Sequence, residues 1–173
     1  MKSVTRSSGS ASATGRISAG PTGGAPAAIG VDRRTGAVFV AGTSSSPAGP
    51  DYWTVAYSRS GSVLWRALYD GPTGADDVSP ALTMDSERGV VYVTGSSSDR
   101  RQPAGAVGGT TVAYATSGQR LRVDVFHGGF QRSVYPLAIA LDPGRGTVFV
   151  TGTAYPTDSD TSAAVTIAYP PAR

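Results

Sequence analysis

The hydrophobic positions of the chain fall into short runs that alternate with turns rich in glycine, proline and serine. Three segments share one template: an alternating apolar run leads to an aspartate, and a continuous run of β-branched and aromatic residues follows. These segments are AAIGVDRRTGAVFVAGTSS (27–45), ALTMDSERGVVYVTGSSS (81–98) and LAIALDPGRGTVFVTGTA (137–154). Alternation is typical of a strand with one buried face, and a continuous run is typical of a strand buried on both faces. The pattern predicts a repeated pair of β-strands and disfavours long helices.

A D-x-x-x-G turn joins the two strands of each pair. The turns begin at Asp32, Asp85 and Asp142. We expect the carboxylate to accept backbone N–H groups and the glycine of the turn to adopt a positive φ. A second glycine follows each aspartate ten residues later, and we expect the strand to end there. These second glycines are Gly42, Gly95 and Gly152.

The second half of the unit also repeats, as TVAYSRSGSVLWRALYDG (54–71) and TVAYATSGQRLRVDVFHG (111–128). It adds a third and a fourth strand to the unit. In the third copy the chain continues only to VTIAYPPAR. We expect the missing strand to come from residues 16–20, because the tetrapeptide Gly-Pro-Thr-Gly follows both that segment and the fourth strand of the first unit.

Tandem units of four antiparallel strands that are apolar on both faces are typical of β-propeller blades. The sequence therefore predicts an all-β fold of about three four-stranded antiparallel units, one of them split between the N- and C-termini. The predicted units are 26–79, 80–135 and 136–171, with strand 16–20 as a detached fourth strand. They form a β-propeller repeat domain at 16–173, preceded by a Ser/Ala/Gly-rich segment, 1–15, that we expect to be a disordered leader.

The motifs DYWTVAYSRSGSVLWRALYDGP and ALTMDSERGVVYVTGSS closely resemble the SBBP-type β-propeller repeat of bacterial extracellular and envelope proteins. The resemblance extends over about residues 16–171. It implies a propeller fold and an extracellular or cell-envelope location, although no signal peptide is found. It implies no particular activity, since this repeat is chiefly an architectural unit. One departure is Arg122, which stands where the first unit has Trp65.

Three blades are fewer than the four to eight of typical closed propellers, so the chain is expected to need a partner. An open row would leave apolar faces uncovered on its first and last blades. One interpretation is a head-to-tail dimer of the chain that closes six blades. The other is that the missing remainder of a longer chain completes the ring, so that this sequence is a fragment. A three-bladed monomer is the remaining possibility.

Composition narrows the set of partners. The net charge of +3 comes from scattered arginines, and no aromatic-interleaved basic stripe of the kind that binds nucleic acid is found. Cysteine is absent from the sequence, which excludes disulfides and thiolate metal sites. No apolar stretch approaches the length of a membrane span. We expect neither a nucleic-acid partner nor a membrane span.

Alternating strand directions should place the longer loops at one edge of the fold, where binding residues usually lie. The candidate ligand-binding residues at this edge are Trp53, Asp76, Asp77, Arg100, Arg101, Arg132, Tyr135 and Tyr155. By contrast, we expect Trp65 and Tyr69, on one face of a strand, to pack between blades. No catalytic set is found, no metal site is assigned and no cofactor is expected.

The sequence thus favours a non-enzymatic binding or scaffold module that contacts a protein or a glycan through its long loops. The alternative is a propeller hydrolase or lyase in which Asp76 and Asp77 form a carboxylate acid/base pair. Adjacent carboxylates on one loop more often cap turns than form a site. A non-functional fragment of a longer propeller is the third interpretation.

Overall fold

The computed structural model describes residues 24–45, 49–71, 76–98, 107–128, 132–156 and 161–172. Over these ranges the chain forms eleven β-strands and no helix. A helix with the length and hydrophobicity of a membrane span is accordingly not found among the described residues.

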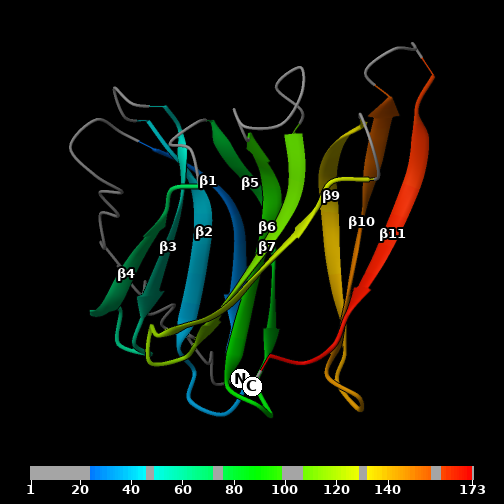
Figure 1. The fold of residues 1–173 in the computed structure, drawn as a ribbon. Coiled ribbons are helices and arrows are strands. Elements are labelled where there is room, and N and C mark those ends of the chain that lie inside the picture. Colours follow the sequence, from blue (N-terminus) through cyan, green and yellow to red (C-terminus); the bar gives the residue numbers. More distant parts are fainter. Residues whose placement is uncertain are drawn as a thin grey trace, which may run out of the picture.

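The strands form three antiparallel sheets, each built from strands that follow one another in the chain (Figure 1). The first sheet contains β1 (Gly24–Val31), β2 (Val38–Ser44), β3 (Asp51–Tyr57) and β4 (Val63–Tyr69). The second contains β5 (Asp77–Asp85), β6 (Val90–Ser98), β7 (Val107–Ala115) and β8 (Arg120–Phe126). The third contains β9 (Arg132–Asp142), β10 (Thr147–Pro156) and β11 (Ala163–Tyr169).

The all-β prediction is confirmed, and the first two predicted units each form a four-stranded sheet. The third unit contributes three described strands. The predicted strand 16–20 and the predicted leader 1–15 lie outside the described residues.

The hairpin turns have the geometry that their sequences predict. Asp32 accepts hydrogen bonds from the Arg34 amide at 3.0 Å and from the Thr35 hydroxyl at 2.6 Å. Asp85 likewise accepts the Arg88 amide at 3.0 Å, and the third turn repeats the arrangement. The glycine that closes each of these three turns adopts a positive φ: 73° at Gly36, 65° at Gly89 and 72° at Gly146.

Gly42, Gly95 and Gly152 lie inside β2, β6 and β10, which corrects the predicted strand ends. The strands that pair with β2 and β10 have a bulge beside these glycines. A Cβ at Gly42 would collide with the carbonyl oxygen of Ala25, and one at Gly152 would collide with that of Tyr135. The glycine therefore permits close backbone approach at the bulge, and the strand continues past it.

An aromatic and aliphatic core joins the first and second sheets. Phe39 of β2 is fully buried there. The Trp65 ring lies between Phe39 and Tyr114, 5.8 Å from each ring centroid, and its indole N–H donates to the Thr116 carbonyl at 2.8 Å. Trp65 and Tyr69 both pack in this core, as predicted.

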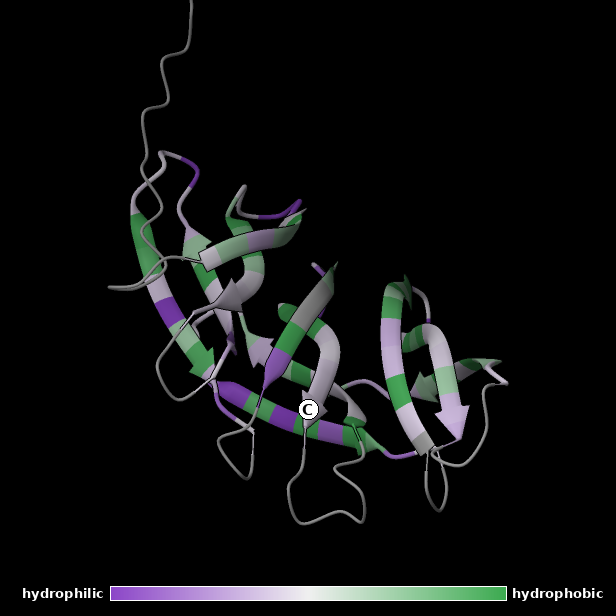
Figure 2. Cartoon of the chain, turned by 90° about the horizontal axis from the view of Figure 1, so that it is seen from above, coloured by the Kyte–Doolittle hydropathy of each residue, from purple (hydrophilic) through white to green (hydrophobic). Residues whose placement is uncertain are grey.

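The second and third sheets pack through the corresponding faces. Tyr92 of β6, which stands where β2 has Phe39, lies in a core with Val148 and Val150 of β10. Figure 2 shows the three sheets side by side in a curved row. The second sheet is therefore covered on both faces, and the first and third sheets each have one face turned away from the row.

One burial prediction holds only in part. β2 and β6 are buried along most of their length, as their continuous apolar sequences predict. β10 has an equally apolar sequence, but its burial alternates, and Phe149 is 42% exposed. Phe149 lies on the face of the third sheet that no described sheet covers.

Arg122 makes a contact that Trp65 does not make in the first unit. Its guanidinium donates to the Pro170 carbonyl at 2.6 Å and to the Pro171 carbonyl at 3.4 Å. The Ala172 amide then donates to the Tyr92 hydroxyl at 3.0 Å. Through these bonds the segment after β11 lies against the second sheet.

Candidate functional site

The two ends of the strands form different edges of the molecule (Figure 1). The short-turn edge carries the hairpins between the first and second and between the third and fourth strands of each unit. The long-loop edge carries the remaining connections, at the ends of β2, β4, β6, β8 and β10. The sequence places the candidate ligand-binding residues at the long-loop edge.

Trp53 is 3% exposed and packs with Val40 and Val55 on the face of the first sheet turned away from the second. Its indole nitrogen is buried and has no hydrogen-bond partner among the described residues. In this conformation Trp53 contributes to packing and presents almost no surface to a ligand.

Asp76 and Asp77 have opposite environments although they are adjacent in sequence. Asp76 is exposed, whereas Asp77 is 0% exposed. One oxygen of Asp77, Oδ2, accepts the Gly71 amide at 2.6 Å, while Oδ1 is buried and has no hydrogen-bond partner in the described part of the chain. In this conformation Asp77 therefore presents no surface to a substrate, and only Asp76 of the two faces the solvent.

Asp77 instead meets Asp51 and Asp70 at the junction of the first and second sheets. A carboxylate oxygen from each of the three lies within 4.8 Å of the other two. Asp51 begins β3, Asp70 follows β4 and Asp77 begins β5, so all three lie at the long-loop edge. Asp51 and Asp70 are not among the residues predicted from the sequence, although the pairing of Tyr52 with Tyr69 makes them neighbours.

The environment raises the pKa of two of these carboxyls. For Asp77, burial raises the pKa, hydrogen bonds from Ser97 and Gly71 oppose the change, and the charges of Asp51 and Asp70 add to it. For Asp51, burial raises the pKa and the charge of Asp70 raises it further. Burial and like charges both disfavour the ionised form.

Tyr135 and Tyr155 lie on the outward face of the third sheet near the long-loop edge, 39% and 43% exposed. Their rings meet edge to face, with centroids 5.9 Å apart and an interplanar angle of 74°. Arg100, Arg101 and the side chain of Arg132, also candidates, lie outside the described residues.

Described residues also line grooves at the short-turn edge. One, of about 800 Å³, lies between the first two sheets and is lined by residues that include Ser58, Arg59, Leu64 and Thr116. Arg59 is the only charged residue among the described lining residues, so this groove lacks the carboxylate pair of a hydrolase.

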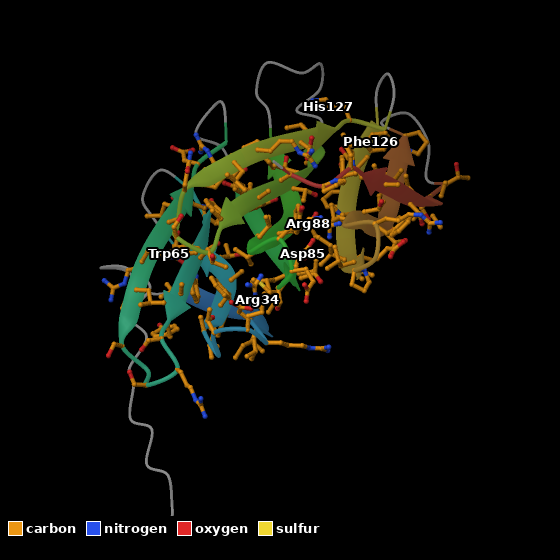
Figure 3. The ribbon with its side chains drawn as sticks, turned by 90° about the horizontal axis from the view of Figure 1, so that it is seen from below. Arg34, Trp65, Asp85, Arg88, Phe126 and His127 are labelled. Carbon is orange, nitrogen blue, oxygen red and sulfur yellow. The ribbon has the colours of Figure 1, made fainter. Side chains whose placement is uncertain are left out.

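Arginines connect successive turns at this edge, where Figure 3 shows Arg34, Asp85 and Arg88. Arg34 donates to the Glu87 carbonyl of the next turn at 3.3 Å, and Arg88 donates to the Pro143 carbonyl of the third turn at the same distance. In the sequence these arginines are only scattered charges. Their partners become apparent only when the sheets are placed side by side.

Comparison of the chain with protein-family models and with curated proteins gives no match.

Proposed function

We propose that the three sheets are β-propeller blades of the SBBP type and that the chain is a non-enzymatic binding or scaffold module. The observation that carries this proposal is one sheet-to-sheet contact made twice. The Phe39 face of the first sheet packs on the second, and the corresponding Tyr92 face of the second packs on the third. Repetition of such a contact around an axis builds a propeller.

In this proposal a second copy of the chain completes the ring. The corresponding face of the third sheet carries Phe149, and no described sheet covers it. The outward face of the first sheet carries Ile29 and Leu68, which are 70% and 61% exposed. A head-to-tail contact between these two unlike faces extends the series and closes six blades in a dimer. In the competing interpretation, the rest of a longer chain provides the blades that cover these two faces.

Light scattering coupled to size exclusion tests the closure. We expect a mass twice the 17.5 kDa of one chain. Phe149→Asp and Leu68→Asp, which each bury a charge in the contact, should both reduce the mass to that of one chain. Val125→Asp is the matched control, because Val125 is 43% exposed but lies on the second sheet. A wild-type monomer would rule out closure by a second copy and favour the longer chain.

The long-loop edge is the binding surface in this proposal, and Tyr135 and Tyr155, at the long-loop end of the outward face of the third sheet, provide its described aromatic contacts. Because the same face contacts the second copy in the ring, the binding of a tyrosine variant is compared with that of the wild type only if the two have the same mass. We expect the double variant Tyr135→Ala and Tyr155→Ala to weaken binding to hits from a glycan array by about tenfold, because a contact aromatic ring contributes on the order of 1 kcal/mol or more. Tyr57→Ala, at the opposite edge, is the control. Unchanged affinity in the double variant would show that these tyrosines do not bind the ligand.

A further inference from the structure

The cluster of Asp51, Asp70 and Asp77 lacks a positive partner among the described residues. The ion pairs found among the described residues join arginines to other aspartates, namely Asp85, Asp124 and Asp142. Three carboxylates within 4.8 Å of one another repel each other strongly unless protons or a cation compensate the charge.

The buried atom Oδ1 of Asp77 is an independent indication that a ligand belongs here. Asp77 is 0% exposed, and its carboxyl accepts hydrogen bonds from the Gly71 amide, at Oδ2, and from Ser97. Oδ1 is nevertheless a buried atom for which the described residues provide no partner of hydrogen-bond geometry. The charged groups that act on this carboxyl include Asp51 and Asp70, both of like sign. A buried carboxylate oxygen without a partner is costly, and a bound metal ion is one of the few groups that remove the cost.

The repeat shows that the fold does not require these aspartates. The corresponding positions at the junction of the second and third sheets are Gly108, His127 and Val134. Val134 is 1% exposed, so an apolar side chain fills the place of Asp77. The second junction forms without any carboxylate at these positions, and the acidic set is therefore particular to the first.

We propose that Asp51, Asp70 and Asp77 bind one Ca²⁺ ion at the junction of the first and second sheets. Carboxylate oxygens are ligands for hard cations, and Ca²⁺ accepts them at about 2.3–2.6 Å in flexible geometry. Oxygens around one Ca²⁺ are therefore separated by up to about 5 Å, which accommodates the observed 4.8 Å limit. Mg²⁺ is usually bound by one or two carboxylates together with waters and substrate phosphates, so a set of three carboxylates favours Ca²⁺.

The ion would connect the two sheets. Asp51 is the first residue of β3 in the first sheet, and Asp70 directly follows β4 of the same sheet. Asp77 is the first residue of β5 in the second sheet. Because the three ligands come together only in the folded chain, Ca²⁺ binds the folded state and raises its stability.

Isothermal calorimetry and thermal unfolding of the full chain test the site. After treatment with a chelator, addition of about 1 mM CaCl2 should raise the Tm by several degrees, with one ion bound per chain. Asp51→Asn and Asp70→Asn should each weaken Ca²⁺ binding at least about tenfold, because each removes one ligand charge. Both side chains are less buried than Asp77, so these variants are expected to fold.

Asp76→Asn is the matched control, because it removes the same charge from an exposed side chain beside the cluster. It should bind Ca²⁺ as the wild type does. Absence of Ca²⁺ binding by the folded wild type would overturn the proposal. So would an equal loss in Asp76→Asn, or full binding by the Asp51→Asn, Asp70→Asn double variant. Mg²⁺ binding as tight as that of Ca²⁺ would overturn the choice of ion.

Discussion

Phe39→Ala is expected to lower the free energy of unfolding by about 3–5 kcal/mol, the usual cost of removing a buried aromatic ring. Phe39 is fully buried between the first and second sheets, and its ring contacts that of Trp65. Truncation leaves a cavity that rigid strands on both sides cannot refill. Denaturant unfolding followed by circular dichroism measures the loss. If Phe39→Ala does not fold, Phe39→Leu should fold with a loss of about 1–2 kcal/mol.

Phe149→Ala is the matched control, with the same residue at the corresponding position of the third sheet. Because Phe149 is 42% exposed, its truncation should cost about 1 kcal/mol or less in the single chain. Any larger loss should depend on protein concentration, since a second copy covers this residue in the proposed ring. Large, concentration-independent losses in both variants would contradict the assignment of buried and open faces.

Asp32→Ala is expected to cost about 2 kcal/mol at pH 7, because it removes a buried carboxylate that accepts several hydrogen bonds. Burial alone would raise the pKa of Asp32, but hydrogen bonds from Thr35, Arg34 and Ser86 outweigh it, and the pKa is lowered. Because the pKa is lowered in the folded chain, Asp32 is protonated at a higher pH in the unfolded chain than in the folded one. The stabilisation is therefore present above the unfolded pKa, near 3.9, and disappears as the pH falls through the folded value.

Urea unfolding of wild type and Asp32→Ala at neutral and acid pH measures this dependence. The difference between the two chains should be largest at neutral pH and should shrink in acid. Asp142→Ala is the control, because Asp142 has the same turn position and a lowered pKa, due chiefly to the Arg145 amide, but its side chain is 30% exposed. A smaller loss is expected there. A difference between wild type and Asp32→Ala that is constant with pH would exclude an ionised carboxylate as its cause.

The sequence was sufficient for the strands and their turns because both depend on local chemistry. The D-x-x-x-G turn at Asp32 contains its own donors, and the alternation of β4 reports which side chains are buried. The glycine inside β2 was misread because its role depends on the bulge in a neighbouring strand. The pattern of apolar residues along a strand predicts which of its faces is buried. It does not predict where the backbone of a neighbouring strand comes close.

The acidic cluster could have been found in part. Pairing Tyr52 with Tyr69 follows from the hairpin, and it brings Asp51 beside Asp70. The position of Asp77 depends on how the second sheet packs on the first, which no local pattern encodes. The apolar run of β10 likewise predicts burial on both faces, but Phe149, on the face turned away from the row, is exposed.

The bond between Ala172 and Tyr92 determines how the molecule can be attached to a surface. Tyr169 pairs with Val148 near the short-turn edge, and the segment that follows continues there along the second sheet. A biotin or affinity tag joined after this segment would leave the molecule from the short-turn edge (Figure 1). Immobilised in that orientation, the chain would present Tyr135, Tyr155 and the whole long-loop edge to the solution, away from the support.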